Sequence, residues 1–324
     1  MMNTRDIIFK SLLAASTLTL GSCHHKPLYV APEKGDTMEI VFDWRYAPDA
    51  SPASMAAYMF PKDDNPQAAG GLRYIFTGRD GGEVRIPYGS YVAVGMNTDT
   101  EEWAVLTGSD NPDRILITTA DADILEGRSI PTRMVPRHDA AVQERMAKAP
   151  GMLWTDNVDD VILRPSPGKK TVTLYPEERI CRYDVRVLDV KNIESLSGGA
   201  VDASLSGISE GVYAGHSNAS DNAVTMPLVL HPEESGDSMF GKFLTFGDTP
   251  VTSNRHILSL YMVLEDGTKW VSTFDVTDQV DNAPDPKNVH IVVRGIDLPD
   301  PGRAPTGLVP DVNDWEAVYV DLHM

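Results

Sequence analysis

Apolar and polar residues alternate along most of the chain, and the first clear example is the run TMEIVFDWR. One side of this run carries Met38, Ile40, Phe42 and Trp44, and the other side is mostly polar or charged. Successive side chains of a β-strand point to opposite faces, so a period of two predicts a strand with one buried face.

Similar short runs follow at close spacing, separated by Gly, Pro and Asp. The run LRYIFTGRDGGEVRIPYG predicts two strands joined by a tight turn at 80–82, and HILSLYMVLEDGTKWVSTFDVT predicts a hairpin that turns at 266–267. Helical patterns are scarce: 139–151 contains helix formers, an Asp that can cap them and a Pro-Gly stop. The predicted fold class is therefore all-β, with β-sandwiches and one short helix.

A Pro-rich passage, LRPSPGKK at 163–170, is the best candidate for a domain boundary. It divides the chain into two parts of similar length, each large enough for one sandwich. We therefore expect an N-terminal sandwich at 37–165 and a C-terminal sandwich at 170–324.

Residues 1–22 have the features of a bacterial export signal. Two basic residues precede an apolar segment that is too short to span a bilayer as a helix. Small residues ending in Ser22 then lead to Cys23, as in the lipobox of bacterial lipoproteins. We expect cleavage between Ser22 and Cys23 and lipid on the Cys23 thiol, in preference to an ordinary secretory signal that happens to precede a cysteine. Residues 23–36 would then be a polar tether between the lipid and the fold.

Composition narrows the classes of partner. The chain has two cysteines, and lipidation of Cys23 leaves Cys181 unpaired, so we expect no disulfide and interpret Cys181 as a small buried apolar residue. Without residues 1–22 there are 26 Lys and Arg against 46 Asp and Glu, a formal charge of −20. A chain this acidic, with no run of basic residues, is not expected to bind nucleic acid or to be attracted electrostatically to an anionic membrane surface. Attachment to the membrane is therefore expected to depend on the lipid.

No motif for catalysis or metal binding stands out. The eight histidines are scattered, without the spacing of a metal-binding helix. The segment GHSNA at 215–219 differs from a G-x-S-x-G elbow and lacks the expected helix, so Ser217 is interpreted as a loop residue. Acidic loops at 108–113, 119–123 and 281–286 fit turn chemistry better than calcium binding. We predict a protein that is not an enzyme and has no cofactor or metal site.

Several segments, in their order and together with the lipobox, resemble a known family. The chain is similar to uncharacterised Bacteroidales lipoproteins within the fimbrillin-like superfamily, the group that contains fimbrium anchoring subunits. The segments that carry this resemblance are VFDW, GSYVAVGMNTDT, RICRYDVRVLDVKNIESLSGGAVDASLSGISEGVYAG, FLTFG, LEDGTKWVSTFDVTDQV and PDVNDWEAVYVDLHM.

The resemblance implies two tandem transthyretin-like β-sandwiches and a role as anchor or accessory subunit of a fimbrium-like surface structure, with other fimbrial subunits as partners. In polymerising members a protease removes the first strand, and an extended strand of the next subunit fills the groove. Arg45 follows the first strand here, where it either permits trypsin-like cleavage or simply faces water.

The terminal run is the candidate for strand exchange, because its apolar residues recur at period two. It can be donated to a neighbour or, in the simpler interpretation, complete its own sandwich. The residues concerned are Val318, Val320, Leu322 and Met324.

We expect the chain at the outer membrane, lipid-anchored and displayed on the cell surface. Surface lipoproteins of these bacteria often carry acidic residues just after the cysteine, whereas HHKPLYV here has none before Glu33, so a periplasm-facing position stays open. The first alternative function is a glycan-binding lipoprotein and the second is a hydrolase with two facing carboxylates or a calcium ion. The aromatic residues considered for a glycan platform are Tyr58, Tyr74, Tyr88, Tyr91, Trp103 and Trp154.

Overall fold

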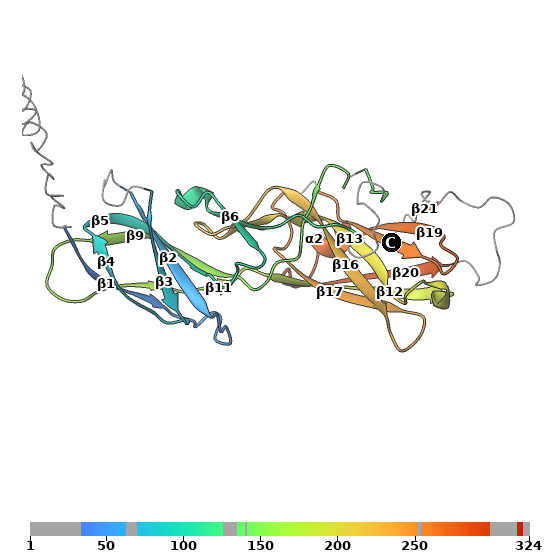
Figure 1. The fold of residues 1–324 in the computed structure, drawn as a ribbon, viewed down its shortest axis with the longest axis horizontal. Helices are drawn as coiled ribbons and strands as arrows, with labels where there is room; N and C mark the ends of the chain where they lie inside the picture. The colour runs from blue at the N-terminus through green and yellow to red at the C-terminus, as the bar shows by residue number, and fades with distance from the viewer. Residues whose placement is uncertain are drawn as a thin grey trace, which may run out of the picture. The chain divides into compact units, whose positions relative to one another are not determined.

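Almost all of the regular structure in this protein is β-strand (Figure 1), which confirms the predicted fold class. The computed structural model describes residues 34–62, 70–125, 135–139, 141–251 and 254–298, and the backbone of 316–319. Among these residues no helix is long and apolar enough to cross a membrane. The one short α-helix in the described part, α2 (Thr277–Asp281), is followed by the long strand β20.

Two sheets enclose the first apolar core. The smaller has the order β10-β1-β4 and the larger has the order β11-β9-β5-β2-β3. Their inward side chains form one buried cluster that includes Ile40, Met55, Tyr91 and Leu174. The strands are β1 (Gly35–Phe42), β4 (Gly81–Pro87) and β10 (Lys170–Leu174) in the smaller sheet, and β2 (Ser54–Pro61), β3 (Leu72–Thr77), β5 (Gly89–Asn97), β9 (Trp154–Leu163) and β11 (Glu177–Glu178) in the larger.

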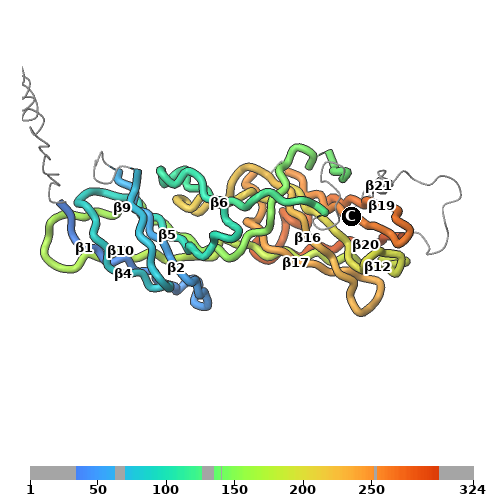
Figure 2. Tube along the Cα trace, in the orientation of Figure 1, coloured from blue at the N-terminus to red at the C-terminus, as the bar shows by residue number. Residues whose placement is uncertain are grey.

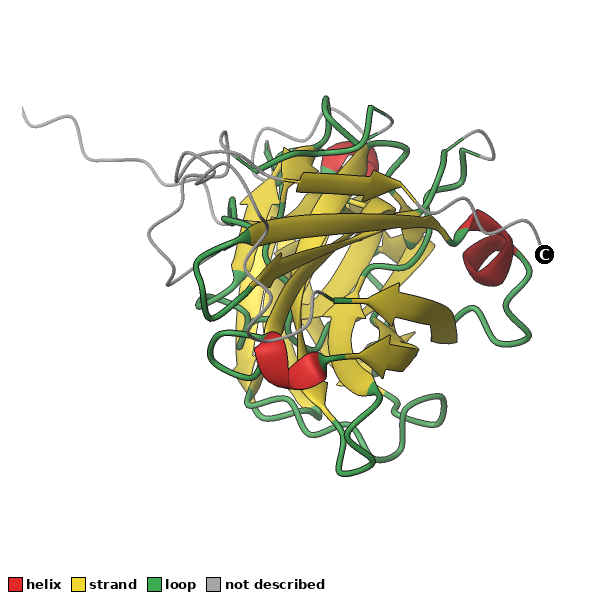
Figure 3. Ribbon diagram, turned by 90° about the vertical axis from the view of Figure 1, so that its right-hand side faces the viewer, coloured by secondary structure: helices red, strands yellow, loops and turns green. Residues whose placement is uncertain are grey.

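A second core lies inside a long sheet with the order β20-β12-β17-β16-β13-β18-β19-β21, with β8 paired to β16. Buried residues of β12 and β20 share one cluster with those of β13 and β18, so the sheet folds over on itself as a sandwich, and Figure 3 shows its strands in layers. Its strands are β8 (Arg145–Met146), β12 (Cys181–Lys191), β13 (Val201–Ser209), β16 (Ala223–Pro232), β17 (Met239–Thr245), β18 (Ile257–Val263), β19 (Lys269–Asp275), β20 (Asn288–Asp297) and β21 (Glu316–Tyr319).

A small sheet combines strands from both halves of the sequence, in the order β15-β14-β7-β6. Its strands are β6 (Ala104–Thr107), β7 (Leu116–Thr119), β14 (Gly211–Tyr213) and β15 (Asn218–Ala219), and the short 3-10 helices are η1 (Pro112–Arg114) and η3 (Ile193–Ser195). A third apolar cluster likewise combines Tyr58 and Ile117 with Val212 and Phe246.

These pairings bear on the predicted domain limits. The strand β10 follows the Pro-rich passage but pairs with β1, so 170–174 belongs with the first sheet and not with the C-terminal sandwich. The pairing of β7 with β14 and of β8 with β16 also crosses the expected boundary. A short strand near a domain boundary can pair with the edge of either sheet. The alternation of its residues does not indicate which sheet it joins. The division into two domains remains a prediction.

The two predicted tight turns have different outcomes. The turn at 266–267 is confirmed: β18 and β19 pair antiparallel, and Gly267 has φ of 85°. The predicted turn at 80–82 is not a hairpin: residues 78–80 separate β3 from β4, which begins at Gly81, and β3 pairs with β2 whereas β4 pairs with β1, so the chain passes there from one sheet to the other. At Gly81, with φ of 94°, a Cβ would lie 2.1 Å from the Ile40 carbonyl oxygen, so the position requires glycine.

The predicted helix at 139–151 is wrong. Turns precede β8 there, and Met146 packs with Tyr261 and Val271. The Glu144 carboxylate accepts hydrogen bonds from Gly207 N at 3.2 Å and from Thr225 Oγ1 at 2.7 Å. A helix of this length is marginal without a packed face, so these tertiary contacts outweigh its modest helix propensity.

Glu144 gives the fold a pH dependence that can be measured. Burial raises the pKa of its carboxyl above the ordinary 4.5, against the lowering effect of Thr225 and Gly207. As pH rises, the folded state therefore keeps the Glu144 proton to a higher pH than the unfolded state does. The stability that this protonated carboxyl contributes is fully present below pH 4.5 and is lost as pH rises through the folded-state pKa. We expect the free energy of unfolding of wild type, minus that of Glu144→Gln, to fall as pH increases from 4 to 8. Urea unfolding at each pH measures it, and a flat or rising difference would contradict the assignment.

Candidate strand-exchange site

The first strand lies in the middle of its sheet and not at an edge. β1 pairs in parallel with β10 from Met38 to Phe42 and antiparallel with β4 from Gly35 to Val41. The trace in Figure 2 shows the three strands side by side. Removal of β1 would expose unpaired backbone groups on both neighbours and open a slot the width of one strand.

The predicted buried face of β1 is confirmed. Met38, Ile40, Phe42 and Trp44 are between 0% and 6% exposed. The Phe42 ring packs edge-on against Phe76 at 6.0 Å between centroids. This side of the slot is therefore a row of apolar pockets at alternate positions, as strand addition requires.

Two acidic side chains of β1 form ion pairs with lysines at the start of the neighbouring strand β10. Lys170 Nζ lies 2.5 Å from Asp36 Oδ2, and Lys169 Nζ lies 2.8 Å from Glu39 Oε1. The hydrogen bonds from Lys170 and Lys169 lower the pKa values of the Asp36 and Glu39 carboxyls, respectively. Ion pairs of this exposed kind add little stability, but they favour one register of β1 on β10.

Arg45 follows β1 in a turn at the surface. Its side chain is 57% exposed, lies 2.5 Å from Asp43 Oδ2 and covers the ring of Tyr175 at 4.8 Å. The side chain of Tyr46 is 63% exposed, so both residues of the Arg45–Tyr46 peptide bond face solvent. The interpretation that Arg45 faces water is confirmed, and cleavage at this bond remains a prediction.

The backbone of the terminal run is described only at β21. Residues 316–319 pair in parallel with β19, with Val318 opposite Ser272. The structure therefore shows the simpler arrangement at Val318, an added strand in its own sheet. Outside the described residues lie Ser22, Cys23, Val320, Leu322 and Met324.

The aromatic residues considered for a glycan platform do not form an exposed surface in the described part of the chain. Tyr58 and Tyr91 are 5% and 0% exposed, and the other four pack partly buried against the same apolar clusters. The interpretation of these residues as core is confirmed.

The other residues considered in the sequence for catalysis or metal binding lie in turns or in the core. Ser217 lies in the turn between β14 and β15 with φ of 58°, and no helix follows it. Asn111 and Asp285 accept hydrogen bonds from backbone N–H groups two residues ahead, as turn residues do. Cys181 is free and half-buried, and burial raises the pKa of its thiol, as is typical of a cysteine that packs as a small apolar side chain.

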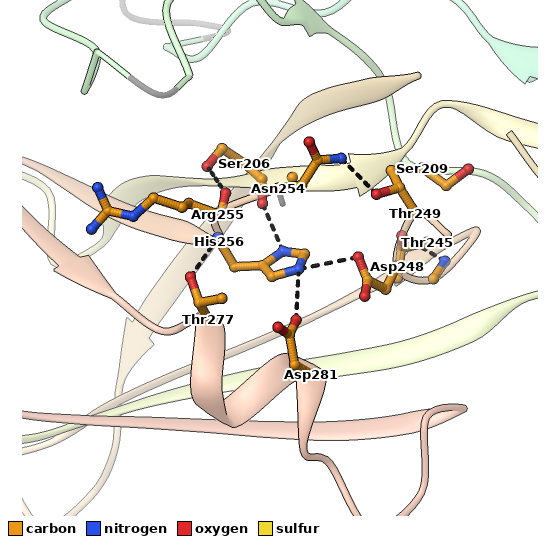
Figure 4. Close-up of polar contacts among 12 residues, drawn as sticks. Ser206, Ser209, Thr245, Asp248, Thr249, Asn254, Arg255, His256, Thr277 and Asp281 are labelled. Atoms are coloured by element: carbon orange, nitrogen blue, oxygen red, sulfur yellow. Dashed lines mark hydrogen bonds and ion pairs between the residues drawn. The ribbon is translucent and has the colours of Figure 1, made fainter. Parts of the chain in front are cut away.

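Sequence reasoning missed one polar cluster, formed by Asp248, His256 and Asp281 (Figure 4). Its members come from a loop, from the residue before β18 and from the end of α2. They are separated by 8 and 25 positions, so no local spacing motif identifies them. Asp281 had been noted only as the first residue of an acidic loop.

Comparison with known proteins gives a family and a fold. A family model described as Domain of unknown function (DUF5119) matches residues 22–229. A search of the curated proteins finds no match. A Bacteroides ovatus structure described as a "putative adhesin" is 20% identical, covering 82% of this chain and 94% of its own, with a TM-score of 0.62. The fimbrial anchor protein Mfa2 from Porphyromonas gingivalis is 11% identical, covering 80% and 90%, with a TM-score of 0.48. The family match covers well over half of the chain, and the Bacteroides ovatus structure shares its fold.

Proposed function

Because the chain belongs to the DUF5119 family and shares its fold with a protein described as an adhesin, we propose that it is an anchor or accessory subunit of a fimbrium-like surface structure. In this proposal lipid on Cys23 holds it in the outer membrane, facing outward, and strand addition joins it to neighbouring fimbrial subunits. The role is structural and not enzymatic.

The observation that carries this proposal is the position of β1. The tether from Cys23 enters the fold at Gly35, the first residue of β1, and spans at most about 40 Å when fully extended. A pull on the lipid therefore acts directly on a strand that is paired on both sides and buried on one face. A strand held in this way resists removal better than an edge strand, as an anchor requires.

The same position bears on which end of the fold would join a neighbour in this proposal. While β1 is in place, its own chain fills the slot between β10 and β4, so no foreign strand can add there. Cleavage after Arg45 would cut the covalent link between the fold and Cys23, and it would open the slot only if β1 then left. In this proposal an intact anchor therefore contributes its other end, the run from Val318 to Met324.

The edge position of β21 supports this assignment. Among the described residues β21 pairs with β19, and β18 occupies the other side of β19. Parallel pairing is also slightly less stable per residue than antiparallel pairing. Release of β21 leaves the rest of the sheet paired, so the run can be donated without loss of the fold.

The membrane attachment is tested by Cys23→Ser. We expect this variant to move from the membrane fraction to the soluble fraction, because the described part of the chain offers no membrane-spanning helix in place of the lipid. Cys181→Ser is the matched control and should remain with the membrane, since Cys181 is half-buried in the fold. Retention of Cys23→Ser in the membrane after a carbonate wash would contradict lipid anchoring.

Orientation is tested on the same cells. Protease added outside intact cells should remove the wild-type chain if it faces outward. Full protection, with digestion only after lysis, would place it on the periplasmic side and contradict the fimbrial role.

A further inference from the structure

Three segments of the second sandwich converge on one buried imidazole. Asp248 lies in the loop after β17, His256 immediately precedes β18, and Asp281 ends α2. Figure 4 shows the His256 ring with both carboxylates on the side of its Nε2 atom. Among the described residues, this is the group of acidic and imidazole side chains whose atoms lie close enough to share a metal ion.

Hydrogen bonds to the His256 backbone and to its Nδ1 atom, on the side of the ring away from the carboxylates, fix the orientation of this side chain. Its side chain is 1% exposed, its Nδ1 lies 3.1 Å from the Ser206 carbonyl oxygen, and its backbone N–H donates to Thr277 Oγ1 at 2.9 Å. A carbonyl oxygen only accepts, so Nδ1 carries a hydrogen and donates it. Histidines that bind metals are held in this way, with the second ring nitrogen donating to a carbonyl or a carboxylate.

The opposite ring nitrogen faces two carboxylates. His256 Nε2 and Asp248 Oδ1 are buried atoms 3.1 Å apart, within ion-pair distance, but the geometry between them is not that of a hydrogen bond. Asp281 Oδ1 lies 3.5 Å from the same nitrogen. A buried nitrogen and a buried carboxylate oxygen without hydrogen bonds carry a substantial desolvation cost, so the arrangement calls for a cation among them.

The spacing also fits a shared ion. Nitrogen and oxygen ligands lie about 2.1 Å from zinc, and two ligands at 90–110° around one ion are therefore roughly 3.0 to 3.4 Å apart. The distances from Nε2 to the two carboxylates are close to this range. Both Asp side chains are nearly two-fifths exposed, so an ion can enter and a water molecule can complete its coordination.

We propose that Asp248, His256 and Asp281 form a binding site for a divalent transition-metal ion of the zinc type. One imidazole nitrogen with two carboxylate oxygens suits zinc, whereas calcium and magnesium prefer oxygen ligands alone. The site joins the loop after β17 and the end of α2 to the start of β18. Bound metal therefore stabilises this end of the second sandwich.

The test is titration of the purified full chain, in detergent, with Zn²⁺. All proteins carry His24→Ala and His25→Ala, because two adjacent histidines beside the lipid can themselves bind zinc. We expect one ion per chain by calorimetry and a rise in Tm that Ca²⁺ does not reproduce. Asp248→Asn and Asp281→Asn should each weaken binding at least about tenfold. Asp278→Asn, an exposed acid on the same helix, should leave it within about threefold.

A second measurement does not depend on the variants folding. In the parent protein, Zn²⁺ should shift the ¹⁵N resonance of His256 Nε2 while Nδ1 keeps its proton. The proposal is overturned if Zn²⁺ neither binds nor raises Tm, or if Asp248→Asn and Asp281→Asn bind it as well as Asp278→Asn does. It is also overturned if the His256 resonances do not move when one equivalent of zinc is added.

Discussion

Replacing Ile40 with Asp is expected to remove a large part of the stability of this fold. Ile40 is 0% exposed at the centre of β1, between β10 and β4, and belongs to the apolar core of the first sandwich. The substitution deletes a buried apolar side chain and places an unpaired carboxylate in its position, which together cost about 4 kcal/mol or more. Domains of ordinary stability have only about 5–15 kcal/mol in total.

Thermal and urea unfolding measure this effect against a matched control on the same strand. Thr37→Asp introduces the same side chain on the exposed face of β1, three positions away, and should change stability by less than about 0.5 kcal/mol. The Ile40→Asp variant should unfold roughly 10 °C lower or fail to accumulate. Equal stabilities for the two variants would show that β1 is not part of the core, and the role of β1 as the link to the lipid would be wrong.

Strand positions followed from alternation wherever one face of a strand is buried against a core. In β1, Met38, Ile40 and Phe42 are buried as the period of two predicts, because a shift by one residue would expose all of them. The turn at Gly267 also followed from local chemistry, since an Asp-Gly pair accepts the required backbone angles. These features depend on neighbours close in the chain.

Features that depend on distant partners were not predictable in the same way. Alternation places β3 and β4 correctly but does not indicate that they join different sheets. The helix expected at 139–151 is absent because Glu144 and Met146 make contacts with segments more than 60 residues away. The cluster around His256 likewise unites three segments that only the folded sheet brings together.

The second prediction of large effect concerns the terminal run. In β21, Val318 lies opposite Ser272 of β19, and adjacent strands are spaced so that their Cα atoms fall within disulfide range. A Ser272→Cys, Val318→Cys protein can therefore be oxidised to hold the run on its own sheet. If the run is donated to a neighbouring subunit, this lock should reduce the recovery of that subunit in a pull-down at least about tenfold, and reduction should restore it.

Matched controls separate the lock from the substitutions themselves. Each single cysteine variant should behave as wild type under both conditions. A Val263→Cys, Lys269→Cys pair places a disulfide across β18 and β19, which stay together whether or not β21 leaves. That protein should recover neighbouring subunits equally well before and after reduction.

The most direct test of strand donation is therefore the recovery of neighbouring subunits with the full-length Ser272→Cys, Val318→Cys chain from intact cells, before and after reduction. Strand donation predicts that neighbours are lost while the disulfide is closed and return when it is opened. Neighbours that remain bound to the fully oxidised chain would contradict it, because the subunit would then be joined through a surface other than its terminal run.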